Sequence, residues 1–115
     1  MTTRRGAYAM VYVTAPDRKT ARAIAQQVLE RRLAACANLL PSESLYWWKD
    51  RIEEARESVV IFKTRRTLVT RLFAAVRDFH PYDVPCAVSY AMQAGLGPYL
   101  EWIGDSTRSR AVDRD

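Results

Sequence analysis

The sequence predicts a single α+β domain with the element order strand, helix, strand, strand, helix, strand, followed by a short helix. Apolar stretches of strand length alternate with two segments of helical periodicity, which indicates this order. A chain of 115 residues, 49% of them hydrophobic, is suited to one compact core. Every apolar run is shorter than the roughly 20 residues of a spanning helix, so we expect a soluble chain without a membrane partner.

The first strand and helix are predicted from contrasting patterns. Residues 8–14 are apolar at both alternating sets of positions, which is typical of a central strand covered on both faces. Asp17 follows at a position where its carboxylate can cap a helix, and the helix is predicted to extend to about Leu33. The apolar positions that repeat at helical spacing are Ala21, Ile24, Ala25, Val28 and Leu29.

A long hairpin is predicted next. Residues 33–40 and 45–48 have the pattern of one strand interrupted near Pro41, and residues 49–51 form the turn. Residues 52–63 return as a strand that is charged in its first half and apolar at 59–62. This hairpin is longer than a small core requires.

The second half repeats the strand–helix–strand pattern. Thr64 or Thr67 is expected to cap a helix that ends at His80 and Pro81, because proline stops a helix. Residues 84–92 are predicted as the last core strand, and residues 98–103 as a short C-terminal helix weakened by Gly104. The apolar stripe of the second helix comprises Leu68, Leu72, Ala75, Val76 and Phe79. The resulting order is the ferredoxin-like βαββαβ sandwich, a fold that supports many functions.

The charge distribution argues against a nucleic-acid partner. The formal net charge is +5, but the two tails contribute +3 of it. The body therefore carries only +2, without aromatic residues interleaved with arginines on one element. We expect a domain over residues 7–107, a flexible N-terminus over 1–6 and a disordered basic tail over 108–115. The N-terminus has no pattern of a cleaved secretion signal, so the expected location is cytoplasmic.

The sequence has few of the residues and motifs that are typical of catalytic sites, so the chain is not expected to be an enzyme. His80 is the only histidine, and the sequence has no Cys-x-x-Cys pair and no glycine-rich phosphate loop. Cys36 and Cys86 are expected to be reduced thiols in a cytosolic protein. Thiolate and imidazole suit Cu(I) and Zn(II), which makes His80, Cys86 and Cys36 candidate metal ligands. Alternatively, Cys36 is a small buried thiol and His80 a cap at the helix end.

A second candidate site is basic. Lys63, Arg65 and Arg66 lie where a strand enters a helix, whose first N–H groups also favour anions, so a carboxylate or phosphate could bind there. The alternative is that these cations form ion pairs within or between subunits. The acidic partners considered are Glu53, Glu57 and Asp83.

The tip of the hairpin is unusually aromatic. Tyr46, Trp47 and Trp48 precede the turn, and Ile52 follows it. Aromatic residues of this kind are enriched where subunits meet, so these four residues are predicted to form an oligomer interface. The alternative is that they fold back onto their own sheet.

Several ordered blocks together resemble the CutA divalent-cation-tolerance proteins over nearly the whole predicted domain. The blocks are residues 11–17, 33–38 with Pro41, 46–49, 52–53, 63–66, 80–85 and 99–103. The resemblance implies a cytosolic, ferredoxin-like homotrimer, similar in architecture to the PII signalling trimers. It also implies a role in tolerance of copper and other divalent cations, and no settled enzymatic activity comes with it. The alternative function is a PII-like regulatory trimer that binds a small anionic metabolite between subunits.

The chain departs from the family at the place where a copper site is described. A cysteine and a second histidine of that site are replaced here by Val13 and Phe79. The glutamate that usually closes the His-Pro-Tyr block of the family is replaced by Cys86. Of the ligands of that copper site, only the histidine at position 80 is present in this chain. We therefore expect that any copper binds through Cys86 or Cys36 with His80, more weakly or with more preference for Cu(I) than at a histidine and carboxylate site.

Overall fold

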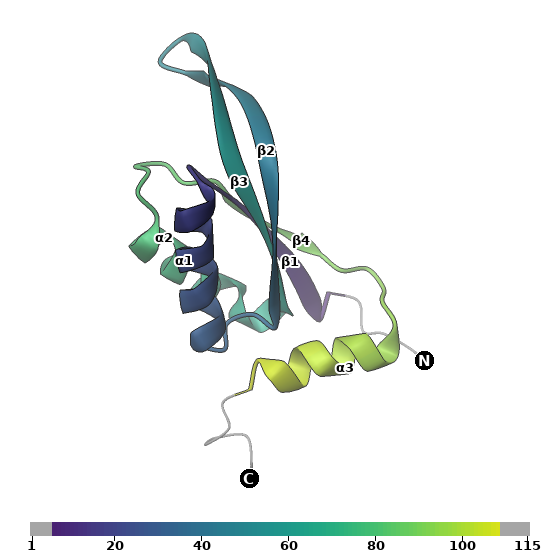
Figure 1. Cartoon of the computed structure of the whole chain (residues 1–115). Coiled ribbons are helices and arrows are strands. Elements are labelled where there is room, and N and C mark those ends of the chain that lie inside the picture. Colours follow the sequence, from purple (N-terminus) through teal and green to yellow (C-terminus); the bar gives the residue numbers. More distant parts are fainter. Residues whose placement is uncertain (1–5, 109–115) are drawn as a thin grey trace.

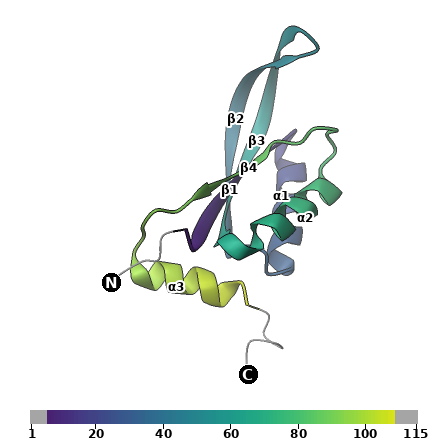
Figure 2. The ribbon, with the colours of Figure 1, turned by 180° about the vertical axis from the view of Figure 1, so that it is seen from behind.

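The computed structural model describes residues 6–108 and contains one four-stranded antiparallel sheet in the order β2-β3-β1-β4. Helices α1 and α2 lie on one face of this sheet, which confirms the α+β, ferredoxin-like prediction (Figures 1 and 2). The elements are β1 (Tyr8–Ala15), α1 (Arg18–Glu30), β2 (Cys36–Trp48), β3 (Arg51–Arg65), the 3-10 turn η1 (Arg66–Leu68), α2 (Val69–Phe79), β4 (Ala87–Ala91) and α3 (Gly97–Ser106). None of the helices in this described range is long and apolar enough to cross a membrane. Apart from Gly6 and Arg108, the predicted flexible N-terminus and basic tail lie outside the described residues.

The predicted start of α1 is confirmed. The Asp17 carboxylate accepts a hydrogen bond of 2.7 Å from the Thr20 N–H. The helix ends at Glu30, about three residues before the predicted end, because Arg32 takes a left-handed conformation with φ of 59°. This turn leads the chain directly into the sheet.

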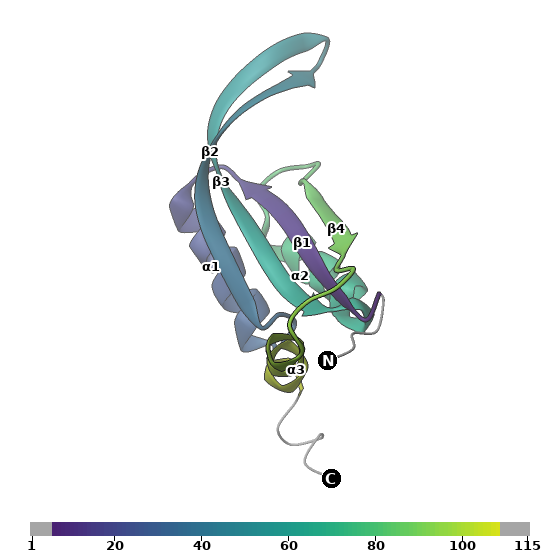
Figure 3. The ribbon, with the colours of Figure 1, turned by 90° about the vertical axis from the view of Figure 1, so that its right-hand side faces the viewer.

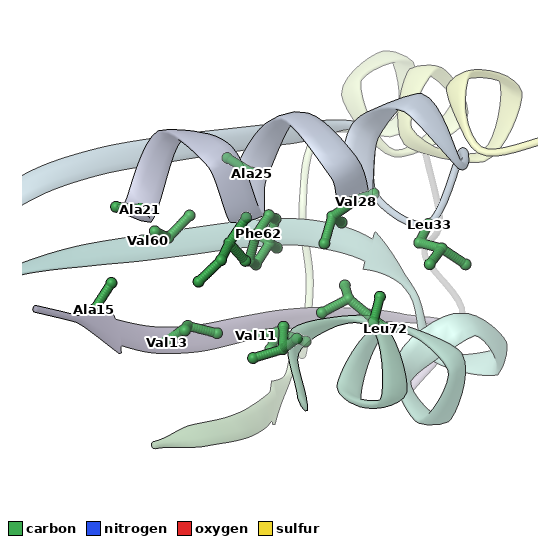
Figure 4. Packing of buried hydrophobic residues seen from close by; sticks show 14 of the residues in the cluster. Val11, Val13, Ala15, Ala21, Ala25, Val28, Leu33, Val60, Phe62 and Leu72 are labelled. Carbon is green, nitrogen blue, oxygen red and sulfur yellow. The ribbon is translucent and has the colours of Figure 1, made fainter. Parts of the chain in front are cut away.

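The hydrophobic core lies between the sheet and the two helices. Val11 and Val13 of β1 lie opposite Phe62 and Val60 of β3, and all four are fully buried. In Figure 4 the labelled side chains of these strands point towards those of α1 and towards Leu72 of α2. This helix-covered face accounts for one of the two apolar faces predicted for the first strand.

The hairpin projects beyond the rest of the molecule. Strand β1 pairs with β3 only from Ser58 to Arg65, so the outer parts of β2 and β3 pair with each other alone (Figure 1). The turn is the two residues Lys49 and Asp50, both with positive φ, as in the tight turns that suit twisted hairpins. The predicted interruption at Pro41 is wrong, because β2 is continuous and Pro41 lies opposite Ser58 on this outer strand, where proline is tolerated.

The predicted cap of the second helix is also wrong. Thr64 is buried at the end of β3, and its hydroxyl donates a 2.6 Å hydrogen bond to the Leu33 carbonyl. The helix begins after η1 without a side-chain cap, and it ends at His80 as predicted. Strand β4 is shorter than predicted because the Thr14 carbonyl, just beyond the last β1–β4 pair, accepts from the His80 ring instead.

Helix α3 packs across one end of the opposite face of the sheet, which we call the open face (Figure 3). Arg65 on this face donates from Nε to the Thr107 hydroxyl at 2.8 Å and from a terminal nitrogen to the Thr107 carbonyl at 3.1 Å. Lys63 lies over the Tyr99 ring at 5.9 Å from its centroid. The helix continues through Gly104 to Ser106, three residues beyond the predicted end. No other element of residues 6–108 covers the rest of the open face.

Candidate functional site

An open pocket of about 810 Å³ is lined by the outer part of the projecting hairpin and by the loop between α2 and β4. Its size is in the range of small-molecule sites, roughly 300–1,000 Å³. The hairpin supplies an aromatic wall, β1 and β3 supply the floor, and the loop closes one side. The lining residues are Thr14, Ser44, Leu45, Tyr46, Trp47, Trp48, Glu57, Pro81, Tyr82, Asp83, Val84 and Cys86.

A chain of hydrogen bonds holds the loop against the sheet. The His80 Nδ1 atom accepts from the Tyr82 N–H at 3.2 Å, and Nε2 lies 2.6 Å from the Thr14 carbonyl. Since Nδ1 accepts, Nε2 carries the proton and donates it to Thr14. The Tyr82 hydroxyl then donates to the Glu57 carboxylate at 3.2 Å. These contacts position Tyr82 and Glu57 at the pocket.

The environment of Tyr82 favours its protonated form. Burial raises the pKa of the Tyr82 hydroxyl, and the negative charge of Glu57 raises it further. Glu57 itself is only 8% exposed. The tyrosine therefore remains a hydrogen-bond donor to this carboxylate over the physiological range of pH.

The three predicted metal ligands are not brought together within one chain. His80 has both ring nitrogens in hydrogen bonds, and Cys86 is exposed in the pocket. Cys36 is level with Met10, four residues from Thr14, which places it about 13 Å away along the strands from the bond that His80 makes. Within one described chain, Cys36 and His80 therefore lie too far apart to bind the same metal ion. Within residues 6–108, no three His, Cys, Asp or Glu residues are grouped closely enough to hold a metal ion.

The structure agrees in part with the alternative roles of these residues, a cap at the helix end for His80 and a small buried thiol for Cys36. His80 is the C-cap residue of α2 through its backbone, but its ring bonds to β1 rather than to the helix. Cys36 is half-buried, and its sulfur lies 3.8 Å from the Tyr99 hydroxyl. Burial raises the pKa of Tyr99, and the contact with Cys36 raises it further.

The basic residues do not form a common anion site within one chain. Arg65 is tied to Thr107, Lys63 lies over Tyr99, and Arg66 is exposed at the start of η1. The predicted ion pairs with Glu53, Glu57 or Asp83 are also not formed within the chain, where Arg108 and Asp105 make the one salt bridge of the described part. Sequence reasoning missed Thr107 as the partner of Arg65 and Tyr99 as the partner of Lys63, because both contacts depend on how α3 packs against the sheet.

The aromatic residues of the hairpin do not fold back onto their own sheet. Trp47 is 72% exposed and Ile52 60%, while Tyr46 and Trp48 are also exposed. Trp47 lies opposite Ile52 in the β2–β3 register, so the two form one apolar surface at the end of the hairpin. The predicted oligomer contact remains a prediction, and its residues also form the wall of the pocket.

The comparison with known families covers almost the entire described chain. The family model of the CutA1 divalent ion tolerance protein matches residues 9–106. The chain belongs to the CutA1 family. Protein CutA of Mus musculus is 42% identical over 105 residues, which are 90% of this chain and 59% of that protein. The divalent-cation tolerance protein CutA of Archaeoglobus fulgidus is 38% identical over 84% of this chain and 94% of its own length.

Solved structures of CutA1 proteins share the fold. CutA1 from Oryza sativa is 36% identical, with a TM-score of 0.87 over 91% of this chain and 97% of that chain. The CutA from Archaeoglobus fulgidus, described as periplasmic, is 36% identical, with a TM-score of 0.86 over 88% and 99%. The chain thus spans about three fifths of the mammalian relatives and nearly all of the archaeal one. These matches confirm the resemblance seen in the sequence.

Proposed function

We propose that this CutA1-family chain is a homotrimeric protein that binds copper or another divalent metal ion and serves in metal-ion tolerance, in the cytoplasm, without catalysing a reaction. Membership of the CutA1 divalent ion tolerance family carries the proposal. The exposed apolar surface at the end of the hairpin supports assembly, since subunit contact would remove it from water. Both ring nitrogens of His80 are engaged in hydrogen bonds within the chain, which argues against acid–base chemistry by this residue.

Cys86 is the donor we assign to copper in this chain. Its thiol lines the pocket and is exposed, and thiolate prefers Cu(I). One described chain does not assemble three donors, so further donors would come from a neighbouring subunit. The charged side chains that line the pocket in the described chain are the carboxylates of Glu57 and Asp83, so like-charge repulsion does not favour the alternative, an anionic metabolite.

Copper titration tests this assignment. Native mass spectrometry with and without copper measures the subunit number and the metal stoichiometry, and competition with a Cu(I) chelator measures affinity. Cys86→Ser is expected to weaken Cu(I) binding by more than about tenfold. Cys36→Ser is the matched control, because Cys36 lies at the other end of the sheet, and its affinity should equal that of the wild type. Equal affinities in all three proteins, or no stoichiometric copper, would contradict the assignment.

A further inference from the structure

The side of the molecule formed by α1 and α2 is strongly basic. We call residues 17–32 and 66–79, which comprise both helices, η1 and the flanking residues, the helix layer; it lies on the face of the sheet opposite the open face (Figures 1 and 2). It has eight Arg or Lys residues and three Asp or Glu residues, all exposed, for a net charge of +5. The rest of the domain, residues 7–16, 33–65 and 80–107, has five Arg or Lys residues and eight Asp or Glu residues, for a net charge of −3.

This separation changes the argument from charge. The small average charge of the domain predicted no nucleic-acid partner. A bound polyanion, however, responds mainly to the charges of the face that it touches, because salt screens charges beyond roughly 10 Å. Soluble proteins usually intersperse both signs over their surfaces. The fold instead collects the positive charge on one side of the domain, which creates a local field that attracts polyanions.

The cations of the helix layer are suited to phosphate. Seven of the eight are arginines, whose planar guanidinium donates two parallel hydrogen bonds to a phosphate group. None of the eight forms a salt bridge within residues 6–108. Arg31 lies over the Phe79 ring at 5.0 Å from its centroid, and Arg32 donates to the Ser106 carbonyl. The remaining six are Arg18, Lys19, Arg22, Arg66, Arg71 and Arg77.

The helix layer offers charge without an apolar patch. Phe79 is the one large apolar residue exposed in these two described segments, and Arg31 covers its ring. A stable protein interface has an apolar centre, single-stranded nucleic acid stacks its bases on aromatic rings, and lasting membrane attachment needs an apolar insertion or a lipid anchor. The backbone of a nucleic-acid duplex needs only cations.

We propose that the helix layer binds the sugar-phosphate backbone of duplex nucleic acid, without reading the base sequence. Helix α1, with 13 residues, spans about 20 Å, and a duplex presents about twelve phosphate charges over that length. The layer is distinct from the proposed subunit contact on the hairpin, so an oligomer would present one such face per subunit. This function goes beyond metal tolerance, and it does not use the Cys86 thiol.

Fluorescence anisotropy tests the proposal, with a labelled 20-base-pair DNA duplex of mixed sequence as the probe. The full chain is treated with chelator, so that no metal ion bridges protein and DNA. The logarithm of the affinity is expected to fall linearly with the logarithm of the salt concentration, with a slope of about −4, since each contacted phosphate contributes roughly −0.9. Duplexes of unrelated sequence should bind equally, and a single strand of the same length more weakly.

Paired substitutions locate the site. Arg22→Gln with Arg71→Gln removes one cation from each helix, and it is expected to reduce the steepness of the salt slope by about 2 and the affinity about tenfold. Glutamine has the helix propensity of arginine, and circular dichroism checks the fold. Arg51→Gln with Arg56→Gln is the matched control, since it removes the same charge from exposed positions of β3 and should bind as the wild type.

A second pair is available in case the first does not fold. Arg18→Gln with Lys19→Gln lies in the first turn of α1, where a positive charge opposes the helix dipole, so its removal does not destabilise the helix. It is expected to weaken binding to the same extent as the first pair.

Four results would overturn the proposal. One is the lack of salt-dependent binding at about 50 mM salt. Another is an equal loss of affinity in the helix-layer and control variants, which would show attraction by net charge alone. Wild-type affinity in folded helix-layer variants would place the DNA on another part of the chain. Retention on phosphatidylserine vesicles at the salt concentration that dissociates the duplex would show a membrane-binding face. The copper titration of Cys86→Ser is independent of all four.

Discussion

His80 illustrates how hydrogen bonding decides the role of a single residue. As the only histidine in the chain, it was the central candidate ligand in the sequence. In the fold its ring joins the loop after α2 to the Thr14 carbonyl of β1, with Nδ1 occupied by the Tyr82 N–H. A ring that donates at one nitrogen and accepts at the other has no lone pair left for a metal. Its function within the chain is therefore to position the loop that carries Tyr82 and Cys86.

Asp17 allows a residue-scale prediction of pH dependence. The Thr20 N–H bond lowers the pKa of the Asp17 carboxyl from its ordinary value of 3.8. A lowered pKa in the folded state contributes stability above the ordinary value, and this stability is lost as pH falls through the folded-state pKa. Asp17→Ala should lower the melting temperature at neutral pH, and the difference from the wild type should shrink in acid.

Asp17→Asn is the control, because its amide oxygen accepts the same bond without titrating. Thermal unfolding followed by circular dichroism measures all three proteins. Identical melting temperatures at neutral pH for the wild type and Asp17→Ala would show that the cap does not stabilise α1.

At the scale of elements, polar contacts tie the end of α3 to β3 and to the turn after α1. Thr107, just after the helix, donates from its hydroxyl to the Ile103 carbonyl and accepts from Arg65. Arg32 also donates to the Ser106 carbonyl at 3.0 Å. These bonds satisfy carbonyls at the helix end that have no partner within the helix. They also hold α3 against the open face, where Arg65 would otherwise be available to an anion.

Arg65→Met is predicted to loosen α3 without unfolding the core. It removes two hydrogen bonds to Thr107, which corresponds to about 1–3 kcal/mol of local stability. Hydrogen exchange of the α3 amides should accelerate, while the amides of α1 exchange as in the wild type. Arg66→Met, at an exposed position in η1, is the control and should change neither. Unchanged exchange in α3 for Arg65→Met would contradict this role.

At the scale of the whole molecule, the hairpin dominates the shape. The principal extents are 51 × 28 × 21 Å, and the long axis reflects strands β2 and β3 projecting past the helices (Figure 3). Their outer parts carry large exposed apolar residues, including Leu45, Trp47 and Ile52. A two-stranded ribbon with such a surface is only marginally stable alone in water. Contact with other subunits would stabilise this ribbon by removing its apolar surface from water.

Replacing Trp47 and Trp48 together by Ala is predicted to dissociate the proposed trimer. Interface tryptophans commonly contribute about 2 kcal/mol or more each, so the double substitution should shift the native mass towards the monomer. Trp102→Ala is the control, since Trp102 is as exposed as Trp48, at 44%, but lies on α3, away from the hairpin. A double variant with the wild-type mass and melting temperature would exclude the hairpin as the main contact.

The sequence by itself determined the features that depend on interactions between residues close together in the chain. Apolar periodicity and the Asp17 cap predicted α1, the His80-Pro81 pair predicted the end of α2, and the short ordered blocks predicted the CutA resemblance. Periodicity reports which face of an element is apolar, so it predicted the order of strands and helices and hence the fold. The same reasoning favoured an aromatic hairpin tip that does not fold back onto its own sheet, and these residues are exposed in the single chain.

Only the tertiary structure decided which of these residues meet. His80 reaches Thr14 across 66 positions, Arg65 reaches Thr107 across 42, and Tyr82 reaches Glu57 across 25. Such contacts depend on strand register and on the packing of α3 and the loop, which local pattern does not encode. The sequence therefore indicated the candidate groups, whereas the fold separated Cys36 from His80 and placed Glu57 in an aromatic pocket.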